Sequence, residues 1–344
     1  MREVYRILDA NFNRAREALR VVEDFARFAL DDAALSGLAK DLRSRLQECF
    51  RHFPAEALLA ARDTPGDVGT ALTSPTESAR GDAAAVVSAA CKRLTEALRT
   101  LEEYAKVAAS DQAGKLEAMR YAAYTLEQRI GLRLAATGRF EKVRLYVLVT
   151  SSLCRGAALD VARAAIAGGA DCLQLREKDM PDRQLLELAR EMHKLTLDAG
   201  ALFIVNDRPD VAAIVGADGV HLGQDDLPVS AARRVLPPGA LVGRSTHNIA
   251  QARAAVEEAA DYIAVGPMFP TSTKDAGPVA GVAYLKQVLA EIATPHVAIG
   301  GITAENVAEL AAAGCRRVAV CSAVIAAPDP KAAAAALKAA LAGK

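Results

Sequence analysis

Hydrophobic side chains recur along the chain at two different periods, and the period changes near residue 140. Before this point the apolar positions follow one another every three or four residues, as in Leu19, Val22 and Ala26. That spacing places them on one face of an α-helix. No alternating strand pattern interrupts the region, so residues 1–138 are predicted to form an all-α, helical-bundle domain.

After a short segment at 137–142, which is predicted to be a linker, short apolar runs alternate with amphipathic helical stretches. The runs are at 145–149, 172–175, 202–205, 219–222, 241–242, 262–265, 296–299 and 317–320. Strands that alternate with helices form right-handed parallel β-α units. Eight units in about 200 residues are typical of a (β/α)8 TIM barrel, so residues 143–344 are predicted to be an α/β barrel domain. An open doubly wound sheet is the main alternative, but no G-x-G-x-x-G motif follows the first run.

The helical half contains an internal repeat, in which residues 14–26 match residues 93–105 at a constant offset. The repeat predicts a pseudo-symmetric bundle with these two helices at its centre. Its charged positions recur every third residue and are Arg14, Glu17, Arg20, Arg93, Glu96 and Arg99. They form either a solvated face with ion pairs worth roughly 0.2–0.5 kcal/mol each, or a charged pocket between the helices that binds a phosphorylated ligand.

Composition narrows the classes of partner. Hydrophobic residues make up 52% of the 344 positions, and the formal net charge is zero at pH 7, which argues against binding of nucleic acid or a membrane. The six cysteines form no C-x-x-C pair, so reduced thiols and a cytoplasmic location are expected. The first residues lack the apolar region of a signal peptide, and the alanine-rich residues 332–342 are too short to span a bilayer. Small-molecule substrates are the expected partners, and a homo-oligomer is left open.

Polar residues follow most of the predicted strands, where a (β/α)8 barrel carries its active site. After the second strand, the alternation of side chains points Gln174, Arg176 and Lys178 to one side. The polar residues at other strand ends are Asn206, Asp207, His221, Asp225, Asp226, Ser245, His247, Cys321 and Ser322. His221 is interpreted as a packed strand residue, and His247 as either a site residue or a neighbour of a helix cap.

Two of these acids are suited to a metal ion. Asp207 and Asp226 lie on neighbouring strand ends, and Mg²⁺ usually takes one or two protein carboxylates together with phosphate oxygens. Arg176 and Lys274 are placed to neutralise the remaining charge, so this side of the barrel is predicted to bind a diphosphate. A simpler interpretation remains open, in which Asp207 caps the next helix and Asp225 or Asp226 is a loop acid.

A second anion site is predicted around residues 266–277, a loop with glycine at both ends that follows the sixth strand. It offers hydroxyl and ammonium donors to an anion, although an ordinary surface loop is the alternative. The donors are Thr271, Ser272, Thr273 and Lys274. Gly300-Gly301 and Cys321-Ser322 follow the last two strands, where barrels commonly bind a phosphate through backbone N–H groups. The sequence therefore predicts two phosphorylated substrates.

At these motifs residues 143–344 resemble thiamine-phosphate synthase over the whole predicted barrel. The motifs are Gln174-Leu175-Arg176-Glu177-Lys178, Asn206-Asp207, His221-Leu222-Gly223-Gln224-Asp225-Asp226, Gly243-Arg244-Ser245-Thr246-His247, residues 266–277, Ile299-Gly300-Gly301-Ile302 and Val320-Cys321-Ser322. Members of that family join 4-amino-2-methyl-5-(diphosphooxymethyl)pyrimidine to a thiazole phosphate and release diphosphate. The resemblance therefore implies a transferase of thiamine biosynthesis.

The resemblance also implies a role for each motif residue. The pyrimidine diphosphate would be held by Gln174, Leu175, Arg176, Glu177, Lys178, Asn206, Ser245 and Lys274, of which the expected catalytic residues are Lys274, Arg176 and Ser245. One Mg²⁺ per barrel would be held by Asp207 and Asp226. The thiazole phosphate would be held by Thr271, Ser272, Thr273, Gly301, Cys321 and Ser322. A related thiazole tautomerase shares this barrel without coupling the two rings, but Asp226 and residues 271–274 favour the synthase, because a tautomerase needs neither diphosphate nor metal.

Residues 1–135 resemble a helical domain that is fused to thiamine-phosphate synthase in some bacteria and is proposed to be a hydroxymethylpyrimidine-phosphate kinase. The resemblance rests on residues 9–15, 17–20 and 63–70. A kinase would use ATP and would supply the substrate of the barrel. However, no G-x-x-x-x-G-K-[ST] loop is present in this half, and a non-catalytic dimerisation or docking module is the alternative. The candidate residues, without assigned roles, are Asn13, Arg14, Glu17, Arg20, Asp63, Asp67, Arg93, Glu96 and Arg99.

Overall fold

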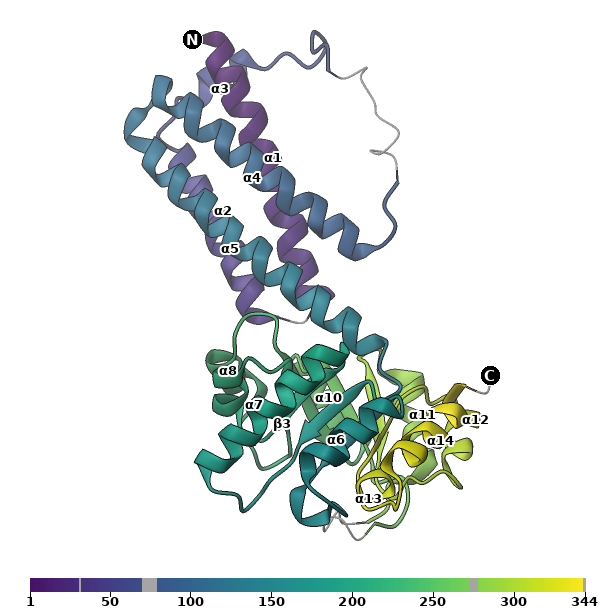
Figure 1. Ribbon diagram of the computed structural model, residues 1–344. Helices are drawn as coiled ribbons and strands as arrows, with labels where there is room; N and C mark the ends of the chain where they lie inside the picture. Colours follow the sequence, from purple (N-terminus) through teal and green to yellow (C-terminus); the bar gives the residue numbers. More distant parts are fainter. Residues whose placement is uncertain (31, 70–78, 272–277, 343–344) are drawn as a thin grey trace. The chain divides into compact units, whose positions relative to one another are not determined.

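The computed structural model describes residues 1–30, 32–69, 79–271 and 278–342. They form two compact units, Met1–Leu134 and Ala135–Lys344. Figure 1 follows the chain from the helical first unit, in purple and blue, into the second unit, in teal, green and yellow, where helices surround the strands. Each unit has a hydrophobic core of its own.

The first unit is a bundle of helices, most of them long, as the sequence predicts. Its helices are α1 (Arg2–Phe28), α2 (Ala33–Phe50), α3 (Ala55–Ala61), α4 (Ala83–Ala108) and α5 (Ser110–Glu141). Aspartates cap two of them. Asp32 accepts hydrogen bonds from the N–H groups of Ala34 and Leu35 at the start of α2, and Asp82 accepts one from Ala85 at the start of α4. Such caps satisfy N–H groups that have no partner inside the helix.

The two copies of the internal repeat lie on α1 and α4, and these helices pack directly against each other. Each copy carries a buried glutamate that is paired with an arginine of the following long helix. Glu23 pairs with Arg43 of α2 at 2.9 Å, and Glu102 pairs with Arg120 of α5 at 2.8 Å. The predicted pair of central helices is therefore present, and equivalent ion pairs connect each copy to its neighbouring helix.

One boundary differs from the prediction. The sequence predicts a linker at 137–142, but α5 continues through this segment to Glu141. Phe140 explains the difference, because its side chain is fully buried and stacks on the ring of Tyr262 with 4.1 Å between the ring centroids. This contact offsets the cost of Gly138 inside a helix, which is about 1 kcal/mol.

The second unit is a closed barrel of parallel strands, which confirms the predicted fold class. In the described residues its strands, in their order around the barrel, are β1 (Leu145–Val149), β2 (Cys172–Leu175), β3 (Leu202–Asn206), β4 (Gly219–Leu222), β5 (Leu241–Thr246), β6 (Tyr262–Val265), β7 (His296–Ile299) and β8 (Val318–Val320). The barrel closes where β8 pairs with β1. The strands follow the predicted apolar runs to within one residue at each end, except that β5 extends four residues further, through polar residues to Thr246.

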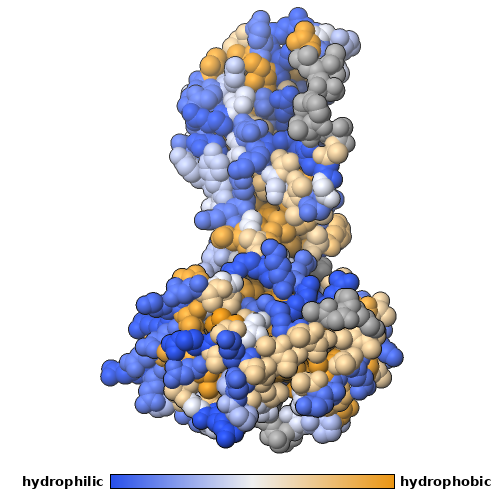
Figure 2. All heavy atoms as spheres, turned by 45° about the vertical axis from the view of Figure 1, so that its right-hand side comes forward, coloured by the Kyte–Doolittle hydropathy of each residue, from blue (hydrophilic) through white to orange (hydrophobic). Residues whose placement is uncertain are grey.

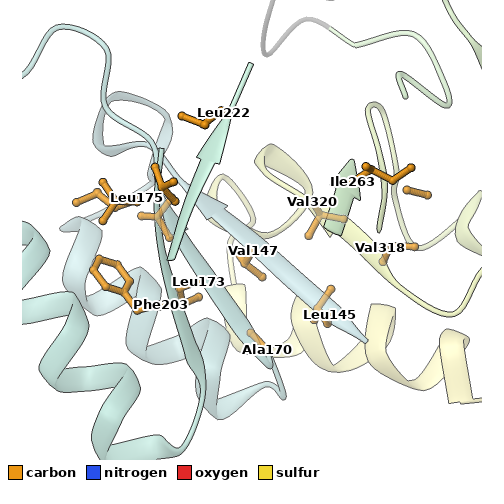
Figure 3. Close-up of a cluster of buried hydrophobic side chains, with 14 of the residues drawn as sticks. Leu145, Val147, Ala170, Leu173, Leu175, Phe203, Leu222, Ile263, Val318 and Val320 are labelled. Carbon is orange, nitrogen blue, oxygen red and sulfur yellow. The ribbon is translucent and has the colours of Figure 1, made fainter. Parts of the chain in front are cut away.

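Helices separate the strands. They are η1 (Ser151–Leu153), α6 (Ala158–Ala167), α7 (Asp182–Ala199), α8 (Pro209–Val215), α9 (Val229–Val235), α10 (Ile249–Glu257), α11 (Gly281–Glu291), α12 (Val307–Ala312), α13 (Ser322–Ile325) and α14 (Pro330–Ala342). Because successive strand residues point to opposite faces, the strands contribute to two cores. In β1, Leu145 and Val147 belong to the outer cluster packed against the helices, while Tyr146 and Leu148 belong to the cluster inside the barrel. Figure 3 shows part of the outer cluster, with side chains from β1, β2, β3, β4, β6 and β8.

Three aspartates fasten the amino ends of the strands. Each directly precedes an even-numbered strand and accepts a backbone hydrogen bond from the strand before it. The aspartates are Asp171, Asp218 and Asp261, and their donors are the N–H groups of Leu145, Phe203 and Val242, at 3.0, 2.8 and 2.7 Å. Each carboxylate also pairs with a cation, respectively Lys338, Arg139 and Arg233. This end of the barrel is therefore held together by polar contacts that serve stability.

None of the described helices is long and apolar enough to cross a membrane. On the face shown in Figure 2, hydrophilic and hydrophobic residues both reach the surface of each unit. The exposed large apolar side chains, such as Phe28, Tyr121 and Leu197, are distributed over different helices. Scattered apolar residues of this kind are normal on a protein surface.

Candidate active site

A cavity of about 340 Å³ opens at the carboxyl ends of the barrel strands. Ligand sites for small molecules commonly have volumes of about 300–1,000 Å³. Every strand contributes to the wall or floor, from Tyr146 and Leu148 of β1 to Ala319 of β8. The cavity therefore lies at the edge where parallel barrels carry their active sites.

Most of the predicted site residues meet in this cavity. Those that line it are Gln174, Arg176, Lys178, Asn206, Asp207, Asp226, Ser245, Thr271, Gly301, Cys321 and Ser322. The side chains of Leu175 and Glu177 do not line the cavity. Leu175 belongs to the outer core, and Glu177 accepts hydrogen bonds from the N–H and O–H groups of Ser151 at 2.6 and 2.7 Å. Ser272, Thr273 and Lys274 lie outside the described residues.

The two predicted metal-binding carboxylates meet on one side of the cavity. Asp207 pairs with Lys178, and Asp226 accepts a hydrogen bond from the N–H of Gly223 at 2.6 Å. The pKa of the Asp226 carboxyl is raised, first by burial and then by its hydrogen bond with Asp207. The interpretation of Asp207 as a helix cap is wrong, because α8 begins after Arg208 with no side-chain cap bond.

These carboxylates suit a hard divalent cation. Two carboxylates in hydrogen-bond contact repel each other unless they share a proton or a cation. Among the described residues no group of three or more His, Cys, Asp or Glu side chains could hold a metal ion. An ion held by Asp207 and Asp226 would therefore need further ligands from water or substrate, which is the coordination that Mg²⁺ commonly adopts.

The loops after β6 and β7 approach each other so closely that two glycines are required. Gly300 and Gly301 have φ angles of 100° and 64°, in the left-handed region that favours glycine. A Cβ atom on Gly301 would lie 2.4 Å from the carbonyl oxygen of Pro270, and one on Gly300 would lie 2.6 Å from the Cα of Pro267. The side-chain amide of Asn306 donates to the carbonyl of Gly301 at 2.8 Å. This side of the cavity is therefore a tightly held wall of backbone.

Cys321 lies in the cavity wall but does not offer a thiolate. Burial raises the pKa of its thiol to about 11, against the lowering influence of the Arg176 guanidinium. The pKa of Cys154 is raised to about 11 by burial as well. Since the thiolate is the nucleophilic form of cysteine, the site is built to bind and position its ligands without a cysteine nucleophile.

The site also contains a buried polar chain that sequence reasoning missed. Hydrogen bonds connect Gln174, Tyr146, Tyr262, His221 and Ser245 in that order. The interpretation of His221 as a packed strand residue is incomplete, because its buried ring also lines the cavity. The available signal was the strand alternation, which places both tyrosines at inward positions among apolar neighbours.

His247 fits both interpretations that the sequence leaves open. Its ring lines the cavity, and its Nδ1 lies 2.7 Å from the carbonyl oxygen of Gly266. It also neighbours the cap of α10, which is Asn248, whose side chain accepts a hydrogen bond from the N–H of Gln251.

In the helical unit, part of the predicted set gathers where the loop after α3 meets α1. Asp9 of α1 pairs with Arg62 at 2.7 Å, and Asn13 donates to the carbonyl of Asp9 at 2.9 Å. Arg6 donates to the carbonyl of Asp63 at 2.9 Å. The carboxylates of Asp63 and Asp67 accept hydrogen bonds from Gly66 and Gly69, respectively, within the loop.

The charged residues of the repeat are exposed, and they are Arg14, Glu17, Arg20, Arg93, Glu96 and Arg99. Arg20 pairs with Asp24 at 3.3 Å, and Arg99 pairs with Glu102 at 2.6 Å. Both pairs lie within one helix. For these two arginines the contacts agree with the interpretation as a solvated face with ion pairs.

Known protein families match both units. A family model described as thiamine monophosphate synthase matches residues 145–324, and one described as the ThiD2 family matches residues 6–129. The first match covers the barrel strands and the cavity. The second covers most of the helical unit.

Individual thiamine-phosphate synthases are also similar to this chain. The thiamine-phosphate synthase of Gloeobacter violaceus is 45% identical over 332 residues, covering 95% of this chain and 94% of its own. That of Thermosynechococcus vestitus is 44% identical and covers 95% and 92%. Among solved structures, a thiamine phosphate pyrophosphorylase from Pyrococcus furiosus is 35% identical, has a TM-score of 0.55, and covers 59% of this chain and 97% of its own. The curated relatives therefore share both units with this chain, and the solved structure has the length of one.

Proposed function

The chain belongs to the thiamine-phosphate synthase family, transferases of thiamine biosynthesis, and we propose that its barrel joins 4-amino-2-methyl-5-(diphosphooxymethyl)pyrimidine to a thiazole phosphate with release of diphosphate. The observation that carries the proposal is the cavity at the carboxyl ends of the strands. It combines a side with cations and paired carboxylates with a side of glycine backbone. The first side suits a metal-bound diphosphate, and the second suits a monophosphate.

The diphosphate side consists of Arg176, Lys178, Asn206 and Ser245, whose side chains all line the cavity. Charge-assisted hydrogen bonds from such groups to phosphate oxygens are about twice as strong as neutral ones. Lys274 is proposed to complete this side. Gln174 lies at the inner end of the same group of residues, where it would contact the pyrimidine ring.

Asp207 and Asp226 are proposed to hold one Mg²⁺ with the diphosphate. Their hydrogen-bond contact and the raised pKa of Asp226 support a site that gains from a cation. When bound, Mg²⁺ would stabilise the charge that develops on the leaving diphosphate. Lys178, which pairs with Asp207, would keep that carboxylate oriented.

The thiazole phosphate is proposed to bind against the opposite wall. The residues there are Thr271, Gly301, Cys321 and Ser322, and Ser272 and Thr273 are proposed to join them. The tight approach of the loops around Gly300 and Gly301 supports recognition by backbone N–H groups, because a phosphate oxygen can come close only where side chains are absent.

The coupling proceeds without a protein nucleophile. The C–O bond to the diphosphate breaks, and its electron pair leaves with the diphosphate. The resulting pyrimidine-methyl cation is stabilised by the amino group of its ring, and the thiazole nitrogen then forms the new C–N bond. The protein holds the reactants together and places donors around the leaving group, which are effects of proximity and of electrostatic stabilisation.

The test uses the full chain with the two substrates and Mg²⁺, and measures thiamine phosphate and diphosphate together. Equal formation of both products is expected, with loss of both when the metal is chelated. Interconversion of thiazole isomers without diphosphate release would instead identify a thiazole tautomerase and overturn the proposal.

For the helical unit we propose phosphorylation of hydroxymethylpyrimidine phosphate by ATP, which would supply the pyrimidine diphosphate. The match of residues 6–129 to the ThiD2 family favours this function. The cluster in which Arg6, Asp9 and Arg62 hold the loop against α1 is the best candidate for its site. The competing function is a non-catalytic dimerisation or docking module.

A variant of the barrel separates the two activities. Asp207→Asn in the full chain is incubated with ATP, Mg²⁺, the pyrimidine monophosphate and the thiazole phosphate. It is expected to accumulate the pyrimidine diphosphate, because its barrel no longer consumes it, whereas the wild-type chain converts it to thiamine phosphate. Absence of ATP consumption in both the variant and the wild-type chain would show that the helical unit is not a kinase and would favour docking.

A further inference from the structure

The polar chain beneath the cavity crosses the inside of the barrel. The Gln174 amide nitrogen lies 2.7 Å from the Tyr146 hydroxyl, and this hydroxyl lies 3.1 Å from that of Tyr262. The Tyr262 hydroxyl lies 3.1 Å from Nδ1 of His221, whose Nε2 lies 3.0 Å from Oγ of Ser245. Since β7 and β8 separate β6 from β1 in the sheet, the contact between the tyrosines joins two strands across the interior of the barrel.

The first bond favours one direction for the others. An amide nitrogen can only donate, so the Tyr146 hydroxyl accepts from Gln174, and its one proton is available for the Tyr262 oxygen. Tyr262 in turn donates to Nδ1 of His221, which leaves the ring proton on Nε2, facing Ser245. The Ser245 oxygen accepts a hydrogen bond from this N–H group, and the hydroxyl proton of Ser245 is left for a ligand in the cavity.

Burial keeps a proton on both tyrosines. Tyr146 and Tyr262 are 1% and 0% exposed, and desolvation raises the pKa of each hydroxyl well above its usual value. Each tyrosine hydroxyl therefore keeps one proton to donate as well as an oxygen that accepts, and each hydroxyl does both within the chain in the arrangement described above.

The surrounding residues leave room for this chain and hold it in place. A Cβ atom on Gly243 would lie 2.5 Å from both the Tyr262 hydroxyl and Nδ1 of His221, so only glycine permits the bond between them. On its other side the Tyr262 ring stacks on Phe140. Because packing already fixes the Tyr262 ring, its hydrogen bonds do not have to hold the ring in place.

The hydrogen-bond chain leaves one buried acceptor atom without a partner. Gln174 is 2% exposed and lines the cavity, and its Oε1 has no hydrogen-bond partner in the part of the chain that the structure describes. A buried oxygen without a partner is costly, and here it becomes satisfied when a ligand donates a hydrogen bond to it.

We propose that Tyr262 is a positioning residue which, through the buried hydrogen-bond chain, fixes the cavity to present an acceptor at Gln174 and a donor at Ser245. The cavity then selects a ligand with the opposite pattern, a donor at its ring end and an acceptor at its other end. An aminopyrimidine that carries a phosphate ester has this pattern. The identity of the ligand rests on the proposed function, whereas the direction of the hydrogen bonds from Gln174 to Ser245 does not.

The direction is tested by ¹⁵N NMR of the histidine-labelled full chain without ligand. The wild-type spectrum is expected to show His221 with its proton on Nε2 and a bare, hydrogen-bonded Nδ1. Tyr262→Phe removes the donor to Nδ1 and is expected to shift that nitrogen resonance. A proton on Nδ1 in the wild-type chain would overturn the proposal without recourse to any variant.

The selectivity is tested by calorimetry with the 4-amino pyrimidine monophosphate and its 4-oxo counterpart, neither of which carries the diphosphate leaving group. The wild-type chain is expected to bind the amino compound about 10- to 100-fold more tightly, since the oxo compound leaves Gln174 Oε1 unpaired. In Tyr262→Phe the ratio of the two Kd values is expected to fall at least about fivefold, because the amide is released to turn its nitrogen toward the oxo group.

Tyr284→Phe is the matched control. Tyr284 is also buried and donates its hydroxyl to Thr246 at 2.7 Å, but it belongs neither to the chain nor to the cavity wall. Removal of the Tyr284 hydroxyl should leave the ratio of the two Kd values unchanged. If Tyr262→Phe unfolds, Tyr146→Phe breaks the chain one bond from Gln174 and should give the same fall.

The outcomes separate this proposal from the proposed function. A wild-type chain that makes no thiamine phosphate contradicts the proposed function, while the NMR measurement still decides the direction of the hydrogen bonds. A wild-type chain that makes thiamine phosphate, combined with an unchanged Kd ratio in Tyr262→Phe or an equal fall in Tyr284→Phe, contradicts the role of Tyr262.

Discussion

At the scale of single residues, the cavity depends on backbone conformations that few side chains accept. Asp207 has a φ of 59° and Gly301 a φ of 64°, both in the left-handed region. Asp and Asn enter this region more readily than other residues that carry a Cβ. A substitution at either position therefore changes the backbone as well as the side chain, and the choice of replacement decides what an experiment measures.

Asp207→Asn removes the charge of the carboxylate but keeps a residue that tolerates the backbone. We expect the Mg²⁺ concentration needed for half-maximal thiamine phosphate formation to rise about 100-fold, with an unchanged unfolding temperature. The measurement is a metal titration of product formation. Asp210→Asn is the control, because Asp210 lies nearby in the first turn of α8 but is exposed and pairs with Arg208. An equal effect in both variants would contradict a metal-binding role for Asp207.

Gly301→Ala places a Cβ against the carbonyl of Pro270 and should displace the backbone beside the thiazole phosphate. We expect the KM for this substrate to rise by about tenfold or more, with the KM for the pyrimidine diphosphate little changed. The control is Gly200→Ala at the end of α7, which has a φ of 70° and no atom within 4 Å of the added Cβ. It should cost about 1 kcal/mol of stability and leave both KM values as they are.

At the scale of secondary-structure elements, the two ends of the barrel have different tasks. The carboxyl ends carry the polar residues of the cavity. The amino ends are closed by aspartates that join one strand to the next, and Gly-Ala-Asp at 169–171 and at 216–218 marks two of these positions in the sequence. Changes at this end should therefore alter stability and leave the chemistry of the cavity intact.

Asp261 tests this division. Its carboxylate accepts from the N–H of Val242 and pairs with Arg233, and its side chain is 2% exposed. Asp261→Ala leaves the buried N–H of Val242 without an acceptor and removes the carboxylate partner of Arg233, which should lower the free energy of unfolding by about 3 kcal/mol. Asp261→Asn keeps an acceptor for Val242 and should cost less. Both are measured by urea unfolding. A loss of turnover in folded Asp261→Asn would contradict the division of tasks between the two ends.

At the scale of the whole molecule, α5 belongs to both compact units. It begins at Ser110 in the first unit and ends at Glu141 in the second, where Phe140 packs on Tyr262 inside the barrel. The end of the helical half is therefore part of the barrel core. A division of the chain at residue 143, which the apolar pattern suggests, would remove this contribution.

Two fragments measure the contribution of Phe140. Residues 135–344 retain it and residues 143–344 lack it, so we expect the shorter fragment to be less stable by about 3–5 kcal/mol, the range for loss of a buried phenylalanine. Urea unfolding of both fragments is the measurement. Phe140→Ala in the full chain is the matched variant and should destabilise the barrel unit to a similar extent. Equal stability of the two fragments would show that the last turn of α5 is dispensable.

The sequence by itself determined the architecture of each unit and most of the cavity. Helical and strand periods are local properties, so the apolar runs predicted the strands of the closed barrel with only small differences, as at β5. Strand alternation likewise predicted that Gln174, Arg176 and Lys178 would line the cavity together, because a side chain at the end of a strand has only two faces to choose from.

Only the tertiary structure decided which residues meet across the barrel. Tyr146 and Tyr262 are 116 residues apart, and neither position differs locally from an ordinary inward strand residue. The same holds for Phe140. Its helix continues through an apparent linker because Phe140 packs on the ring of Tyr262, which is far away in the sequence. The contact of Asp207 with Asp226, and the close approach of Gly301 to Pro270, also depend on how neighbouring strand ends are brought together. Such contacts follow from the closure of the barrel, which no local pattern contains.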